Sequence, residues 1–159
     1  MKNPRVRPFE DRDADAVVAL SLRAWEPVFE SIEKAMGTEI FALLHPDWRV
    51  DQRQAVEAAL ASRKAWVAEV DANTVGFVAV ELHHEGGLGE IHMLAVAPEF
   101  QNDGVGTALT GFALAWMKKE GMSVAMVETG GDPGHAAARR TYEKAGYALL
   151  PIAKYFKKL

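Results

Sequence analysis

Two glycines separate a strand-like stretch of the chain from a helical one, and their surroundings are typical of an anion-binding loop. Residues 88–97 are apolar and rich in strand-forming side chains, and Pro98 ends them. Residues 107–121 carry apolar side chains three and four positions apart, as on one face of a helix. Gly104 and Gly106 lie between the two stretches. A strand, a glycine loop and a helix N-terminus present free backbone N–H groups and a positive dipole end, so we expect a phosphate or pyrophosphate here.

Two common phosphate-binding patterns do not match this loop. The dinucleotide fingerprint needs a third glycine three residues after the second, and Leu109 occupies that position. A Walker loop needs Gly-Lys-Ser or Gly-Lys-Thr, but Gly106 is followed by Thr107 and Ala108. The pattern that fits is Gln-x-x-Gly-x-Gly, which begins at Gln101.

This pattern, preceded by a strand that carries Glu90, resembles the acyl-CoA signature of the GNAT superfamily of N-acetyltransferases. A second segment, His135-x-x-Ala138-x-x-x-Tyr142 and then Gly146-Tyr147, is similar to the second signature of that family. The family usually has Asn-x-x-Ala-x-x-x-Tyr followed by Gly-Phe or Gly-Tyr. Two motifs in the expected order are more specific than either motif alone.

The resemblance covers roughly residues 64–158 and implies acetyl-CoA as the acyl donor, without a metal. A primary amine would attack the thioester directly in a ternary complex. A local splay or bulge of the strand would let the pantetheine arm pair with the backbone, and the N–H of Leu94 would polarise the thioester carbonyl. The residues implied in cofactor binding are Leu94, Ala95, Val96, Gln101, Asn102, Asp103, Gly104, Val105, Gly106, Thr107, His135, Ala138 and Tyr142.

Three side chains are candidates for proton transfer. Glu90 occupies the position of a frequent family base, which would deprotonate the ammonium acceptor directly or through water. Strand alternation would place Glu90, His92 and Leu94 on one face and Ile91, Met93 and Ala95 on the other. His92 is therefore a rival base, a substrate contact or a hydrogen-bonded structural histidine. Tyr142 matches the family tyrosine that protonates the departing thiolate, so we expect a general acid there, although it could simply pack against Tyr147.

Two residues depart from the family pattern. Asp103 stands where many relatives carry a basic residue, and its carboxylate would weaken binding of a pyrophosphate unless it points to solvent or caps the helix. His135 replaces the usual asparagine, although it can still donate one hydrogen bond to the cofactor. Arg139 and Arg140 could pair with CoA phosphates or form a solvated helix face. These departures keep open a second hypothesis, a CoA-binding regulatory module without catalysis.

The acceptor is less well defined. The resemblance places its contacts on the first helices and the last strands, where the aromatic and acidic side chains are Trp25, Glu26, Phe29, Glu30, Tyr155 and Phe156. Such a lining would suit a cationic amine. A small-molecule amine is the first expectation, including an aminoglycoside-like one, and a protein N-terminus or lysine is the alternative. Because dimers are frequent among similar proteins, a homodimer is a further possibility.

The composition of the 159 residues sets limits on function. The composition, with 49% hydrophobic and 25% charged residues, predicts one globular domain over residues 1–159. A net charge of −4 argues against nucleic-acid binding, and no apolar run is long enough to span a membrane. The chain has no cysteine, so it has no disulfide framework and no cysteine nucleophile for an acyl-enzyme. We expect a cytoplasmic protein.

The periodicity of the chain predicts the elements that must position these groups. A helix up to Trp25 should be interrupted by Pro27 and followed by a second helix at Val28–Met36. The fold class is α/β of the α+β type, with a mixed, mostly antiparallel central sheet of about six to seven strands and helices on both faces, as in the GNAT fold. The remaining helices are expected at residues 51–62, 107–121 and 133–145, and the strands at 5–9, 65–70, 74–82, 88–97, 122–128, 147–150 and 152–157.

Overall fold

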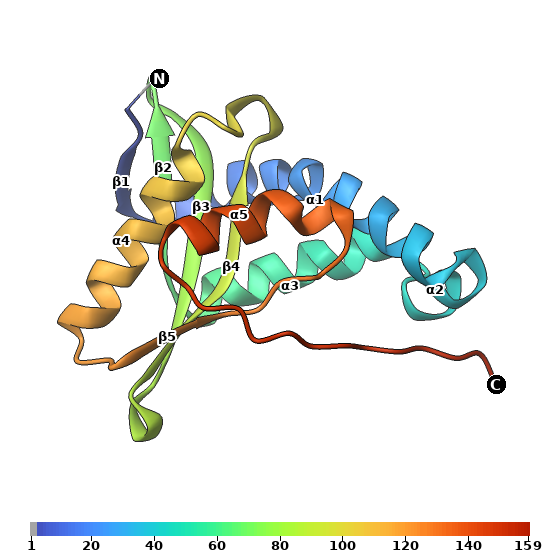
Figure 1. Cartoon of the computed structure of the whole chain (residues 1–159). Coiled ribbons are helices and arrows are strands. Elements are labelled where there is room, and N and C mark those ends of the chain that lie inside the picture. The colour runs from blue at the N-terminus through green and yellow to red at the C-terminus, as the bar shows by residue number, and fades with distance from the viewer. Residues whose placement is uncertain (1–2) are drawn as a thin grey trace.

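The computed structural model describes residues 3–159 of the chain, and five strands within them form one sheet (Figure 1). The strand order is β1-β2-β3-β4-β5. The first four strands pair antiparallel, and β5 pairs parallel with β4, which confirms the mixed, mostly antiparallel sheet. The strands are β1 (Arg5–Pro8), β2 (Lys64–Val70), β3 (Asn73–His83), β4 (Leu88–Val96) and β5 (Val124–Val127).

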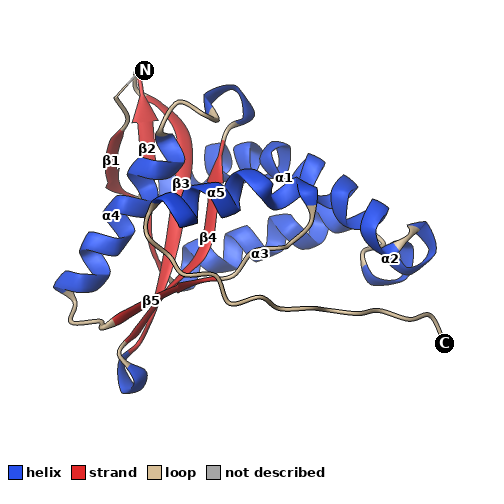
Figure 2. Ribbon diagram, viewed as in Figure 1, coloured by secondary structure: helices blue, strands red, loops and turns tan. Residues whose placement is uncertain are grey.

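Helices cover both faces of this sheet, as expected (Figure 2). Helices α1 and α3 pack on one face around a core that includes Val17, Val56 and Phe77. Helix α4 packs on the other face, where Leu109 and Val78 belong to a second core. Strand β3 contributes to both cores because successive side chains point to opposite faces of a sheet. The helices are α1 (Ala14–Met36), α2 (Thr38–Leu44), α3 (Trp48–Ser62), α4 (Val105–Lys119) and α5 (Ala136–Lys144).

A β-bulge interrupts the alternation of β4, so our assignment of its two faces was wrong in part. Ala79 of β3 is opposite Met93, but the next residue, Val80, is opposite Ile91, which leaves His92 as an extra residue. Ile91 consequently packs in the α4-side core, whereas Met93 packs against the α1-side core. An extra residue in one strand reverses the facing of the residues beyond it.

Pro27 does not break the first helix, contrary to the prediction. Helix α1 runs without interruption from Ala14 to Met36 and contains Pro27 near its middle. The proline removes one backbone donor, and packing of the long apolar face of α1 against the sheet compensates for this loss. Helix α2 was not predicted. Helix α3 starts earlier than predicted, where Asp47 accepts a hydrogen bond from the Val50 N–H at 3.3 Å.

The two strands predicted after α5 are absent from the structure. Helix α5 ends near Gly146, as predicted, and residues 147–159 then run as an extended segment along the molecule (Figure 1). Most of its apolar side chains are exposed, including Ile152 at 75% and Tyr155 at 90%. The sheet therefore has five strands instead of six to seven. None of the helices in residues 3–159 combines the length and apolar character needed to cross a bilayer.

Candidate active site

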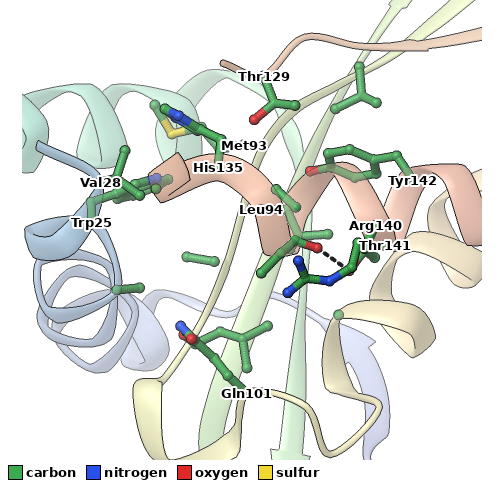
Figure 3. Close-up of a pocket in the computed structure, with 18 of the residues that line it drawn as sticks. Trp25, Val28, Met93, Leu94, Gln101, Thr129, His135, Arg140, Thr141 and Tyr142 are labelled. Carbon is green, nitrogen blue, oxygen red and sulfur yellow. Dashed lines mark hydrogen bonds between the residues drawn. The ribbon is translucent and has the colours of Figure 1, made fainter. Parts of the chain in front are cut away.

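A cavity of about 760 Å³ opens between α1, β4, the glycine loop and α5 (Figure 3). It contains most of the residues that we predicted to bind a cofactor. Asp103, Val105 and Glu90 are the predicted site residues that do not line it. Those that do are Leu94, Ala95, Val96, Gln101, Asn102, Gly104, Gly106, Thr107, His135, Ala138 and Tyr142.

The wall formed by β4 has unpaired backbone groups because β4 and β5 separate. Their parallel pairing ends where Ile91 is opposite Val127, whereas β4 continues to Val96. Beyond Ile91, the edge of β4 that faces away from β3 has no neighbouring strand among the described residues. An extended arm with alternating donors and acceptors could pair with this edge, as a peptide does when it adds a strand. The splay expected around Leu94 is therefore present.

The glycine loop leads into α4 with a backbone that favours glycine. Gly104 is the N-cap of α4 and has a φ of 83°, in the left-handed region where a side chain causes strain. Among the described residues no side-chain hydrogen bond caps this helix, so its N-terminus has no side-chain acceptor for the N–H groups of the first turn. Val105 is 1% exposed and anchors the first turn in the core. Asp103 is exposed and does not provide the cap that we had considered.

Tyr142 extends from α5 into the cavity and is itself largely buried. Its ring packs edge-on against Tyr147, with 5.8 Å between the ring centroids. Burial, together with the nearby Tyr147, raises the pKa of Tyr142 to about 12. The phenol consequently keeps its proton at neutral pH and can donate it. Tyr142 therefore packs against Tyr147 and also lines the cavity, so the two roles expected from the sequence do not exclude each other.

Glu90 does not line the cavity. Its carboxylate is 3.0 Å from Nε2 of His83, and Glu81 lies beside it. The ligand atoms of these three residues are within 4.8 Å of one another, close enough for a metal ion, but Arg63 already pairs with Glu81 at 3.1 Å. His92 does line the cavity, and burial and the Arg63 charge lower its pKa, against the opposing effect of Glu90 and Glu81.

The end of the cavity where we expected the acceptor is apolar and aromatic. Trp25 and Phe29 of α1 line it as predicted, and Met93 is at the same end of the cavity as Trp25 (Figure 3). Glu26 and Glu30 do not line it. Glu26 instead forms an ion pair with Arg49 at 2.6 Å. The acidic lining expected from the sequence is thus largely missing.

Three further predicted residues lie elsewhere. Tyr155 and Phe156 border a separate, smaller pocket near the end of α1. Arg139 donates hydrogen bonds to the carbonyl oxygens of Gly130 at 2.6 Å and Asp132 at 2.7 Å, so it holds the loop before α5. Arg140 lines the main cavity.

Sequence reasoning missed Asp132 and Ser31, which support His135 from outside the cavity. Asp132 contacts the ring of His135 and accepts a hydrogen bond from the Ser31 hydroxyl at 2.6 Å. The spacing of Asp132 and His135 was a usable signal, because residues three apart at a helix start can contact each other. Ser31 is 101 residues from Asp132, and no local pattern connects them.

Curated proteins that resemble the chain are named mycothiol acetyltransferases. The protein from Streptomyces avermitilis is 35% identical over 83 residues, which cover 52% of this chain and 26% of that protein. The protein from Thermobispora bispora is 29% identical over 165 residues and 97% of this chain, but 50% of its own length. The chain thus spans about half or less of the length of these relatives.

Solved structures with the same fold are less similar in sequence. The aminoglycoside N-acetyltransferase AAC(6′)-Iy, in complex with a CoA bisubstrate analogue, has a TM-score of 0.67 at 16% identity, with 99% of each chain covered. The PaiA N-acetyltransferase from Thermoplasma acidophilum, in complex with coenzyme A, has a TM-score of 0.69 at 14% identity, covering 95% of this chain and 93% of that one. The model of the GNAT acetyltransferase family matches residues 25–147, most of the sequence, and the chain therefore belongs to the GNAT acetyltransferase family.

Proposed function

We propose that the protein transfers an acetyl group from acetyl-CoA to a small-molecule primary amine. The observation that carries this proposal is the open edge of β4, which meets the uncapped N-terminus of α4 and Tyr142 in one cavity. The pantetheine arm would pair with residues 92–96 of β4. The pyrophosphate would bind the N–H groups at Gly104 and Gly106. Residues 1–159 would work as one acetyltransferase domain.

The chemistry would follow from this placement. The N–H of Leu94 would polarise the thioester carbonyl and stabilise the oxyanion that forms when the amine attacks it. As the carbon–sulfur bond breaks, Tyr142 would hydrogen-bond the departing sulfur and pass it a proton. The high pKa of this phenol keeps the proton in place until negative charge develops on sulfur. Glu90 could contribute only through water or His92, since it does not line the cavity.

The residues that line the cavity and the names of the relatives both bear on the class of acceptor amine. Some relatives are named mycothiol acetyltransferase or aminoglycoside N-acetyltransferase, and these names support a small-molecule amine. Among the described residues Glu128 is the one carboxylate in the cavity lining, which also includes the apolar side chains of Trp25, Phe29 and Met93. A polycation would find few counter-charges there, so an amine attached to an uncharged, partly apolar body fits better.

Thiol release in the presence of acetyl-CoA and a panel of primary amines tests this function. We expect CoA to appear with uncharged-body amines, more slowly with aminoglycosides, and not at all without enzyme. Calorimetry with CoA provides the second measurement. Binding of CoA without thiol release from any amine would favour a non-catalytic CoA-binding module, and absence of binding would refute the cofactor assignment.

We propose in addition that two copies associate through the C-terminal segment. Leu149, Leu150 and Ile152 are each more than two-thirds exposed in an extended segment, and the outer edge of β5 has no strand partner in residues 3–159. Such apolar surface is costly in water and is typical of a protein contact. Light scattering should give the mass of a dimer for the full chain and of a monomer for the Leu150→Ser/Ile152→Ser variant. The matched Leu43→Ser variant, in an exposed part of α2, should stay dimeric.

A further inference from the structure

Three hydrogen-bonded side chains join α1 to the loop before α5. The Ser31 hydroxyl donates to Oδ2 of Asp132 at 2.6 Å, and Nδ1 of His135 contacts Oδ1 of the same carboxylate. The side chains of Asp132 and His135 are 15% and 19% exposed. We propose that His135, oriented by Asp132, is the general base that removes the proton from the acceptor amine. This inference rests on the acetyl transfer proposed above.

The surroundings of Asp132 fix the proton positions on the imidazole. Burial alone would raise the pKa of Asp132, but the hydrogen bonds from Ser31 and His135 outweigh it and hold the pKa below its usual value. The carboxylate is therefore ionised at neutral pH and accepts the Nδ1–H of His135. This leaves Nε2 with a free lone pair, the arrangement of a histidine base oriented by a carboxylate.

The ring of His135 lies between the carboxylate and the cavity. His135 lines the cavity, whereas Asp132 and Ser31 do not. Figure 3 shows His135 at the end of the cavity that holds Trp25 and Met93, and Tyr142 on the opposite side. A base on the acceptor side and an acid on the sulfur side is the division of roles that amide formation requires.

The two other bases considered from the sequence lack this support. Glu90 does not line the cavity and is bonded to His83. His92 lines the cavity, but no carboxylate in residues 3–159 is hydrogen-bonded to it. A base works best when a second group fixes its tautomer and accepts part of its positive charge. His135 is the cavity histidine that has such a partner.

The loop that carries this pair is held in place from two sides. Arg139 donates to the carbonyl oxygens of Gly130 and Asp132. Gly134 approaches α1 so closely that a Cβ at this position would be 2.5 Å from the Cβ of Ser31, and its N–H donates to the Ser31 hydroxyl at 2.9 Å. Catalytic groups need such support, because small displacements reduce the rate strongly.

The proton balance of the reaction is then complete. The acceptor ammonium gives one proton to Nε2 of His135, and the neutral amine forms the new carbon–nitrogen bond with the thioester carbonyl. The carbon–sulfur bond breaks, Tyr142 protonates the sulfur, and the tetrahedral nitrogen loses its second proton, which restores the phenol through water. His135 releases its proton to solvent after the amide and CoA leave.

The His135→Asn variant tests the proposal because it keeps an amide donor that is usual for this motif but removes the base. We expect kcat/KM for the amine to fall by about 10²- to 10⁴-fold at neutral pH. The CoA dissociation constant, measured by calorimetry, should stay within about threefold of wild type. In the wild type, the pH profile of kcat/KM should have an acidic limb. In His135→Asn this limb should be absent, and kcat/KM should instead rise with pH up to the pKa of the amine. Equal losses in CoA binding and turnover would make His135 a cofactor contact and overturn the proposal.

Two further variants separate the base from its support and from its rival. Asp132→Asn should keep part of the activity, because an amide oxygen can still accept the Nδ1–H but carries no charge to balance the imidazolium. His92→Gln should retain the limb. If His92→Gln removes the limb and His135→Asn retains it, the base is His92 and the proposal is wrong.

A measurement without turnover distinguishes this inference from the function on which it rests. Histidine ¹⁵N NMR of the wild type, with His135 assigned from the signal lost in His135→Asn, should show a protonated Nδ1 at neutral pH. The opposite tautomer would refute the base assignment even if amines are acetylated. The expected tautomer without any acetylation of the amine panel would refute the proposed function and, with it, the role of His135.

Discussion

The two sides of the cavity are assembled in different ways. The proposed cofactor side uses residues 94–107, a continuous strand–loop–helix segment, and α5 closes it. The proposed acceptor side combines α1 with the bulge in β4 and the loop before α5, and its central hydrogen bond joins Ser31 to Asp132. The residues of a contiguous segment can be recognised from their spacing in the sequence. The residues of the acceptor side are far apart in the sequence and come together only when the chain folds. The two sides should therefore respond differently to substitution.

The largest effect should come from Tyr142, on the proposed cofactor side of the cavity. For Tyr142→Phe we expect kcat to fall by about 10²- to 10⁴-fold, because the departing sulfur loses its proton donor. Stopped-flow and steady-state thiol release would measure this loss, and calorimetry should show CoA affinity little changed. Tyr147→Phe is the matched control on the adjacent ring, which does not line the cavity. A comparable loss of kcat in both variants would indicate a packing defect rather than lost acid catalysis.

A second test addresses the anchoring of α1, on which the acceptor side depends. Arg7 of β1 holds Asp13, at the start of α1, through two hydrogen bonds of 2.8 Å. Arg7→Met would leave the buried carboxylate without its cationic partner, with only the Glu10 N–H donating to it at 2.9 Å, and we expect a loss of about 3 kcal/mol in the free energy of unfolding. Urea denaturation at neutral pH measures this difference. The exposed pair of Arg12 and Glu10 supplies the control, since Arg12→Met should change stability by less than about 1 kcal/mol.

The same anchor predicts how stability depends on pH. The hydrogen bond from Arg7 is the main cause that lowers the pKa of Asp13, and burial opposes it. Arg7 likewise lowers the pKa of Glu69. Because the folded pKa of each carboxyl is below its unfolded value, the stabilisation is complete above about pH 5 and is lost as the pH falls below 4. In Arg7→Met this acid-dependent loss should be smaller.

The sequence predicted most of the residues that line the proposed cofactor side, because the features of this side are local. The glycine loop, the strand before it and the helix after it are contiguous, and periodicity alone locates them. Tyr142 and His135 follow from a second local motif. What remained hidden was the face on which each β4 residue would lie, because the bulge at His92 depends on pairing with β3.

The predictions that were wrong concern elements whose structure depends on tertiary contacts. Local rules end a helix at Pro27, but the packing of α1 over both α3 and the sheet carries the helix past it. The apolar residues after Gly146 resemble strands, yet no strand of the described chain pairs with them. From the sequence we expected Glu26 to contact the substrate, but its carboxylate pairs with Arg49, which is 23 residues away in the sequence.

A third test perturbs the acceptor side and leaves the cofactor side intact. Gly134→Ala would place a methyl group against Ser31 and push the loop away from α1. We expect kcat/KM for the amine to fall by about 10- to 100-fold through misplacement of His135, with CoA binding retained. Gly131→Ala is the matched control, because its added methyl group would meet no atom within 4 Å. Weakened CoA binding in Gly134→Ala would show that the two sides are not separable.

A fourth test perturbs the cofactor side and leaves the acceptor side intact. Gly106 lies in the first turn of α4, and a Cβ there would meet the side chains of Val96 and Thr141 only at 3.8 and 3.9 Å, so Gly106→Ala is sterically tolerated. The melting temperature should rise slightly, because alanine favours the helix. CoA affinity should fall by about tenfold, because the methyl group keeps the pyrophosphate from the backbone. Unchanged affinity by calorimetry would mean that the anion binds elsewhere.

The smallest effect is expected inside α4, where the fold is most predictable from sequence and one buried group still does not fit. Thr110 is fully buried, and its hydroxyl has no hydrogen-bond partner among the described residues. Thr110→Val keeps the shape but removes the unsatisfied oxygen, so we expect a gain of about 1 kcal/mol in the free energy of unfolding, with kcat and CoA affinity unchanged. Thr107→Val, on the cavity wall of the same helix, should give no such gain in urea denaturation. A loss of stability in Thr110→Val would mean that the hydroxyl has a bonding partner, such as a buried water, and that even this locally specified helix depends on a contact that its sequence does not reveal.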